Sequence, residues 1–261
     1  MLAGTANDQL VGHPVSLTRA TDTADSEARG EVDDGRVNPV EALLEATTRY
    51  LTALDGVTEE QLREPSQLPG WTRGHVVAHI ALNAHGFARA LRGTRTGEPI
   101  PMYDSPEARN ADIEERASGS RDELAAFNQM ASLRLAGELR LMKALATIER
   151  LPGGVVLDAA QVVELRWREV EIHHADLDIG YLPSHWPTPF AAYLLETAAD
   201  DRSQEVSLTL HARDIDKTVL VGKGGHGVAG SAGDLAWWLV GRGSGEGLTS
   251  TRPLPELGSW K

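Results

Sequence analysis

The segment from Asp158 to Leu177 constrains the fold most strongly, because it reads as a helix that carries acidic and imidazole side chains on its apolar side. At about 100° per residue, Glu169 and His173 lie one above the other beside the apolar stripe, whereas Glu171 falls on the opposite side. We therefore expect Glu171 to face solvent and Glu169 with His173 to point inward. The negative charge of a buried carboxylate must be balanced by a cation or by hydrogen bonds. This pair therefore predicts either half of a metal site or a hydrogen-bonded core pair.

A third ligand is expected from residues 68–83, which form a second helix with a histidine on its inner side. Thr72 follows a Pro-Gly turn and suits a helix N-cap, and the apolar residues after it keep helical spacing. His79 flanks this apolar stripe, while His75 and His85 turn away from it. His79 is therefore the favoured ligand, with a hydrogen-bonded core histidine as the alternative.

Two further amphipathic segments complete a set of four long helices. One spans residues 38–55 and begins with Asn-Pro, a suitable N-cap followed by proline at the first helical position. The other spans residues 121–150 and would bury Leu145, whereas the His79 helix is expected to end near Leu91. Four amphipathic helices with connections of moderate length predict a bundle, in which metal ions bind between facing helices.

The remaining sequence predicts three regions in chain order. Residues 1–37 are poor in apolar side chains and are expected to be a disordered extension. Residues 38–182 are expected to form the metal-binding bundle. Residues 183–261 begin with a proline-rich linker and are expected to form a small α/β domain. Within it we expect helices at 190–200 and 234–240, strands at 206–211 and 218–221, and a hairpin loop at the glycine-rich stretch 222–227.

Composition excludes several classes of function. A net charge of −13 without a basic patch argues against nucleic acid as a partner. The chain has no cysteine, so any thiol chemistry must come from a bound cosubstrate. No apolar run is long enough to span a membrane and no signal peptide is recognisable, which predicts a cytoplasmic protein without a membrane partner.

Four motifs carry a resemblance to a known family. They are Gly70–His79, the Arg-Glu-Val-x-x-His-x-x-Asp-Leu pattern at 168–177, Pro101–Asn110 and Gly241–Ser244. Together they resemble mycothiol-dependent maleylpyruvate isomerases, over a stretch from residue 38 to the C-terminus. The two histidine motifs are shared by the wider DinB-like superfamily of metal-binding bundles, whereas the other two are more specific to the isomerases.

The resemblance implies an α+β fold with a DinB-like four-helix bundle followed by a small α/β domain of sterol-carrier-like shape. It also implies zinc, or another divalent metal, bound by His79, Glu169 and His173. Arg242 from the C-terminal domain is implied to reach the active site, with a helix-end cation as its alternative role. The implied partners are mycothiol, a low-molecular-weight thiol, and a dicarboxylate substrate, with a monomer expected to suffice.

The implied reaction converts maleylpyruvate to fumarylpyruvate by reversible addition of the thiolate to the double bond. Arg242 would clamp a substrate carboxylate or stabilise the enolate. Tyr103, Arg109 and Arg166 are further candidates for binding the cosubstrate, although Arg166 suits better a role as partner of the Glu169 carboxylate. Asp176 is expected either to orient His173 or to cap its helix.

Two other functions stay open at this stage. A mycothiol S-transferase would use the same metal site and leave the thiol attached to an electrophile. A non-catalytic, metal-stabilised protein that binds small molecules would have a closed metal site or an Arg242 that faces solvent.

Overall fold

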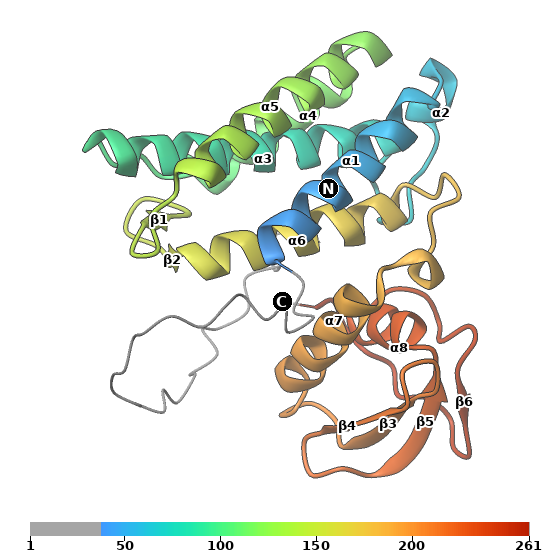
Figure 1. The fold of residues 1–261 in the computed structure, drawn as a ribbon. Helices are drawn as coiled ribbons and strands as arrows, with labels where there is room; N and C mark the ends of the chain where they lie inside the picture. Colours follow the sequence, from blue (N-terminus) through green and yellow to red (C-terminus); the bar gives the residue numbers. More distant parts are fainter. Residues whose placement is uncertain (1–37, 261) are drawn as a thin grey trace, which may run out of the picture.

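The computed structural model describes residues 38–260, so the extension expected at 1–37 lies outside the described part. It is mostly helical up to residue 182 and contains a small sheet beyond it, which confirms the α+β class (Figure 1). Among the described residues, no helix is both long enough and apolar enough to cross a lipid bilayer.

Four long helices form the N-terminal part, as the apolar periodicity predicts. Each begins at a side-chain N-cap that accepts a hydrogen bond from the first turn. Two shorter helices lie in the connections. The long helices are α1 (Pro39–Asp55), α3 (Arg73–Thr96), α5 (Arg121–Leu141) and α6 (Ala159–Asp176), and the short ones are α2 (Glu59–Arg63) and α4 (Pro106–Ala117).

Two helix ends differ from the sequence prediction. α5 ends at Leu141 because Met142 adopts an extended backbone, and Leu145, expected in the core, is 94% exposed. The chain then forms the antiparallel strands β1 (Thr147–Glu149) and β2 (Val156–Asp158). α3 continues past residue 91 to Thr96, where Gly97 with a φ of 82° ends it.

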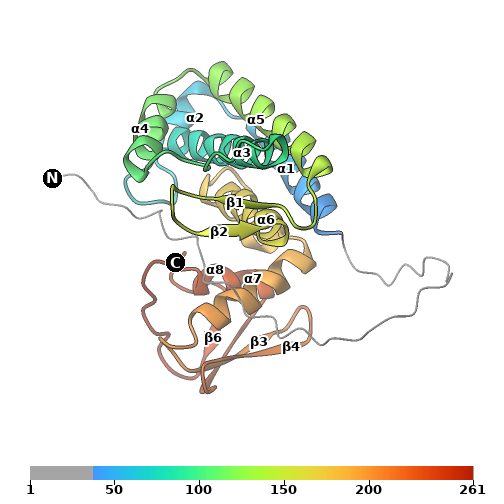
Figure 2. The same cartoon turned by 90° about the vertical axis from the view of Figure 1, so that its left-hand side faces the viewer.

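The C-terminal part is a four-stranded sheet with two helices packed on it (Figure 2). The strand order is β4-β3-β5-β6, and β3 pairs parallel with β5. The prediction of a hairpin loop at 222–227 was therefore wrong: the stretch connects β4 to a strand on the other side of β3. The elements are η1 (Pro183–His185), α7 (Thr188–Asp201), β3 (Leu208–Ala212), β4 (Lys217–Val221), β5 (His226–Gly230), α8 (Ala232–Leu239) and β6 (Thr249–Ser250).

α6 is the helix that joins the two parts. Its bundle side packs on α1 and α3, and Trp167 on its other side stacks on Tyr193 of α7, with ring centroids 5.9 Å apart. Trp186 in the connection donates its indole N–H to the backbone carbonyl of Glu171 at 3.3 Å. Both sides of α6 are thus covered by protein.

Because α6 is covered on both sides near Glu171, the expectation that Glu171 faces solvent was wrong. Its side chain is fully buried and accepts hydrogen bonds from Arg49 of α1 and from the Tyr181 hydroxyl, both at 2.6 Å. The Tyr181 ring also stacks on His174, with centroids 3.9 Å apart. The helical wheel failed here because it assumes one solvent-facing side along the whole helix, whereas no residue of α6 from Arg166 to Asp176 is exposed.

Tyr181→Phe should destabilise the protein by about 1.5 kcal/mol, since it removes a hydrogen bond to a buried charge while keeping the ring. Urea unfolding of the two proteins, compared at equal metal content, measures the difference. Tyr181→Leu should cost more, because the stack on His174 is lost as well. Equal stability of wild type and Tyr181→Phe would show that the hydroxyl contributes nothing.

Candidate metal centre

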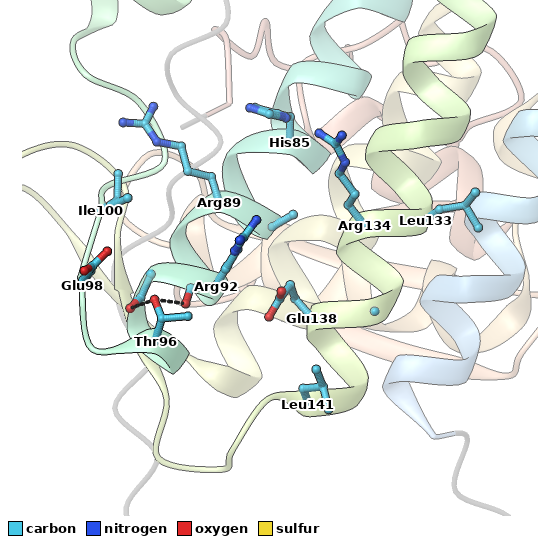
Figure 3. Close-up of a pocket in the computed structure, with 13 residues that line it drawn as sticks. His85, Arg89, Arg92, Thr96, Glu98, Ile100, Leu133, Arg134, Glu138 and Leu141 are labelled. Carbon is cyan, nitrogen blue, oxygen red and sulfur yellow. Dashed lines mark hydrogen bonds between the residues drawn. The ribbon is translucent and has the colours of Figure 1, made fainter.

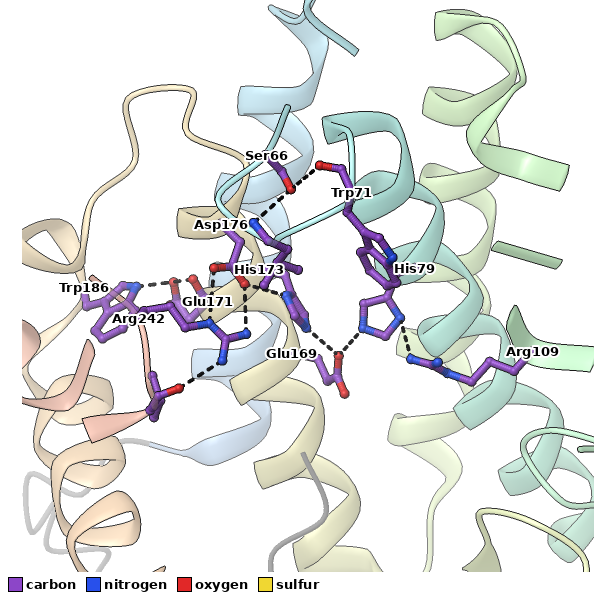
Figure 4. Close-up of polar contacts among 12 residues, drawn as sticks. Ser66, Trp71, His79, Arg109, Glu169, Glu171, His173, Asp176, Trp186 and Arg242 are labelled. Atoms are coloured by element: carbon purple, nitrogen blue, oxygen red, sulfur yellow. Dashed lines mark hydrogen bonds and ion pairs between the residues drawn. The ribbon is translucent and has the colours of Figure 1, made fainter. Parts of the chain in front are cut away.

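The structure brings together the three residues chosen from helical spacing. His79 extends from α3, and Glu169 and His173 extend from successive turns of α6, so that one donor atom of each lies within 4.8 Å of the others (Figure 4). His79 Nε2 lies 2.8 Å from Glu169 Oε2, and His173 Nε2 lies 3.4 Å from the same oxygen. The two imidazole rings are nearly perpendicular, with centroids 4.7 Å apart.

The donor set fits a divalent cation. His173 is fully buried, and its Nε2 has no hydrogen-bond partner among the described residues although it points at the cluster. A buried nitrogen left without a partner is costly, and a metal ion would satisfy it. Two imidazole nitrogens and one carboxylate form the ligand set of catalytic zinc sites, which keep a further coordination position open.

Two of the three donors, His79 and Glu169, have the charge state that a bound cation needs. Burial lowers the pKa of His79 to about 4, so its ring is neutral at physiological pH. Burial opposes ionisation of Glu169, but His79 and His173 outweigh it and hold the pKa of this carboxyl well below its usual value. Burial likewise opposes protonation of His173, yet its hydrogen bond to Asp176 and the nearby Glu169 carboxylate raise its pKa. A metal ion and a proton therefore compete for His173.

Asp176 orients the second histidine and links it to the C-terminal part. Its fully buried carboxylate accepts a hydrogen bond from His173 Nδ1 at 2.8 Å. Arg242 donates to the same carboxylate at 3.3 and 3.4 Å. Although burial opposes ionisation, Arg242 and His173 together lower the pKa of Asp176. This arrangement leaves His173 Nε2 as the donor atom that faces the cluster.

Arg242 is held near the site but does not touch the three donors. It follows α8, bonds to the Val240 carbonyl at 3.0 Å, and its side chain is 11% exposed. The guanidinium reaches the metal cluster only through Asp176 and His173 (Figure 4).

Arg109 of α4 contacts the first histidine. Its guanidinium lies 3.2 Å from His79 Nδ1 and 5.6 Å from the centroid of the Tyr103 ring. A guanidinium can only donate, so Nδ1 accepts here and Nε2 donates its proton to Glu169. A cation bound at Nε2 requires the proton on Nδ1, and Arg109 would then have to turn away.

One residue near the site makes other contacts than the sequence predicted, and another was not predicted to lie there. Arg166 is fully buried, but it donates to the Ile80 carbonyl and to Asn83 on α3 rather than to Glu169. Trp71, which the sequence did not single out, lies with its ring edge against His79, with centroids 5.6 Å apart. Its position just before the N-cap of α3, the helix that carries His79, could have indicated that Trp71 lies near the site.

The fold agrees with that of known proteins. The profile of the family described as "Mycothiol maleylpyruvate isomerase N-terminal domain" matches residues 43–178, more than half of the chain. Two solved structures, mycothiol-dependent maleylpyruvate isomerase and a histidine-to-alanine mutant of it, superpose with a TM-score of 0.76. They are 27% and 26% identical, and the match covers 85% of this chain and 95% of theirs. A comparison with curated protein sequences finds no match. From the profile match and the shared fold, this chain belongs to the mycothiol-dependent maleylpyruvate isomerase family.

Proposed function

We propose that the protein is a zinc-dependent cis-trans isomerase that converts maleylpyruvate to fumarylpyruvate by reversible addition of mycothiol to the double bond. The observation that carries the proposal is the cluster of His79, Glu169 and His173, in a chain of this family. The absence of cysteine supports it, because the nucleophilic sulfur must then be supplied by a cosubstrate.

His79, Glu169 and His173 would hold the zinc ion. A zinc ion bound by three protein groups supplies Lewis acidity that lowers the pKa of a thiol. Asp176 keeps the proton of His173 on Nδ1, and Trp71 and α6 shield the imidazoles from bulk water. The chain thus contributes a dry site in which charge interactions are strong.

Two arginines are suited to the anionic substrate. Arg109 would leave His79 when a metal binds, and its planar guanidinium could then donate two hydrogen bonds to a substrate carboxylate. Arg242 is proposed to clamp the other carboxylate or to stabilise the enolate, while it keeps Asp176 ionised. Tyr103, buried beside Arg109, would contact the bound substrate from the same side as Arg109.

The test is conversion of maleylpyruvate by the zinc-loaded protein, with and without mycothiol. We expect fumarylpyruvate to form only when the thiol is present, and the thiol to be recovered unchanged. Consumption of mycothiol with formation of a thioether would indicate an S-transferase instead. No conversion and no adduct, despite bound zinc, would indicate the non-catalytic binding protein. The metal's identity follows from elemental analysis of the purified protein.

The proposal also includes a monomer acting in the cytoplasm on small molecules. Gel filtration with light scattering measures the oligomeric state directly.

A further inference from the structure

A second concave surface lies on the outer side of the bundle, between the C-terminal halves of α3 and α5. It has a volume of about 790 Å³ (Figure 3), and neither His79, Glu169 nor His173 lines it. Arg92, which lines it, lies about 20 Å from His79 along α3 and on the other side of the helix. None of the residues of the proposed reaction lines this groove.

The groove concentrates unpaired positive charge in a strongly acidic protein. Arg92 on α3 and Arg134 on α5 form no salt bridge or side-chain hydrogen bond with the described residues. Other charges in the groove are largely matched. Arg89 pairs with Asp104 at 2.6 Å, and the Glu138 carboxylate accepts hydrogen bonds from Nε and Nη2 of Arg95 at 2.8 and 2.9 Å.

Glu98 at the rim is the remaining acidic residue of the groove, so the unpaired guanidiniums outnumber the unpaired carboxylates. The positive charges also converge on one side chain. Half-burial of His85 and the nearby Arg134, Arg89 and Arg116 lower its pKa. His85 is thus a neutral imidazole beside the cations, able to share a hydrogen bond with a bound anion.

Apart from Thr96, the rest of the groove is apolar. Leu133, Leu141 and Ile100 are 63%, 58% and 39% exposed, which is unusual for large apolar side chains, and all three line the groove. Gly93 and Gly137 also line it, one on each helix, and Gly137 leaves open space beside these side chains, since a Cβ there would meet no atom within 4 Å. Figure 3 shows His85 and Arg134 toward one end and Leu141 toward the other. Ile100 lies beside Arg89 and Leu133 lies level with Arg134, so cationic and apolar side chains are neighbours in the groove, a combination that matches an amphipathic anion.

We propose that this groove is a second ligand site, which binds a small organic carboxylate with an apolar body. The carboxylate lies between Arg92 and Arg134, because two guanidiniums can bind its two oxygens. The apolar body covers Leu133 and Leu141 and removes their exposed surface from water. The site is independent of the proposed isomerase reaction.

Titration of the full-length protein with benzoate, followed by methyl NMR of Ile100, Leu133 and Leu141, tests the proposal. We expect saturable shifts at these methyl groups. The double variant Arg92→Gln/Arg134→Gln should weaken binding at least tenfold, whereas Arg140→Gln, an exposed arginine of α5 outside the groove, should change it less than twofold.

Acetate carries the same charge without the apolar body and should bind at least fivefold more weakly than benzoate. No saturable shift, unchanged binding in the double variant, or equal affinity for acetate and benzoate would each overturn the proposal. So would shifts confined to residues around His79, because benzoate would then occupy the metal cluster.

Discussion

His79→Ala should reduce zinc affinity by more than about 100-fold. Loss of a residue that only orients a metal ligand already costs about 10- to 100-fold in affinity, and loss of the ligand itself should cost more. Isomerase activity should fall to background in parallel. The substitution removes one of three donors and leaves Glu169 with a single imidazole partner. Zinc content after dialysis against a competing chelator and turnover of maleylpyruvate, measured on the same samples, check the two effects.

The matched control for His79→Ala is His75→Ala, one turn earlier on the same helix. His75 turns away from the cluster and completes the capping box of α3 with Thr72. Its loss should cost about 1 kcal/mol of stability and leave zinc content unchanged. Equal loss of zinc in the two variants would contradict the assignment of His79 as a ligand. Circular dichroism excludes unfolding as the cause.

Arg242→Ala should lower kcat by about 100- to 1,000-fold while the protein keeps its zinc, as expected for a group that stabilises charge in the transition state. The two hydrogen bonds to Asp176 are lost, but His173 still donates to that carboxylate. Steady-state kinetics on zinc-quantified protein measures the effect. Arg242→Lys keeps a positive charge near Asp176 and should recover part of the activity.

Zinc content separates the two ways in which Arg242 can act. Loss of zinc from Arg242→Ala, with activity restored by excess zinc, would show that Arg242 acts only through Asp176 and His173. A fully active Arg242→Ala enzyme with normal zinc content would remove this residue from the mechanism.

The sequence predicted that His79, Glu169 and His173 come together because two short-range rules sufficed. The spacing of Glu169 and His173 places them on successive turns, and the apolar stripe of α3 indicates which histidine faces inward. The N-cap Thr72 indicated where α3 begins, and α6 begins beside Asp158, where the segment was expected to start. These features depend on residues within one helix and need no knowledge of its neighbours.

The errors arose where distant parts of the chain decide the environment. Glu171 is buried because α1 and the connection to α7 both close over it, which no single-helix pattern reveals. Leu145 keeps helical spacing, yet the chain leaves the helix so that Ile148 and Leu157 can pair in a two-stranded sheet. The parallel pairing of β3 with β5 is similarly non-local. Pairing partners of this kind are specified by packing rather than by local propensity.

α6 is buried between the bundle and the C-terminal part, and this restricts how the architecture can be altered by recombination or by engineering. A replacement for the C-terminal part would have to supply an aromatic surface against Trp167 and a cation against Asp176. Without them, the helix that carries two donors would present an apolar face and a bare carboxylate to water. The two halves of this chain are therefore not interchangeable modules, and their sequences must change together.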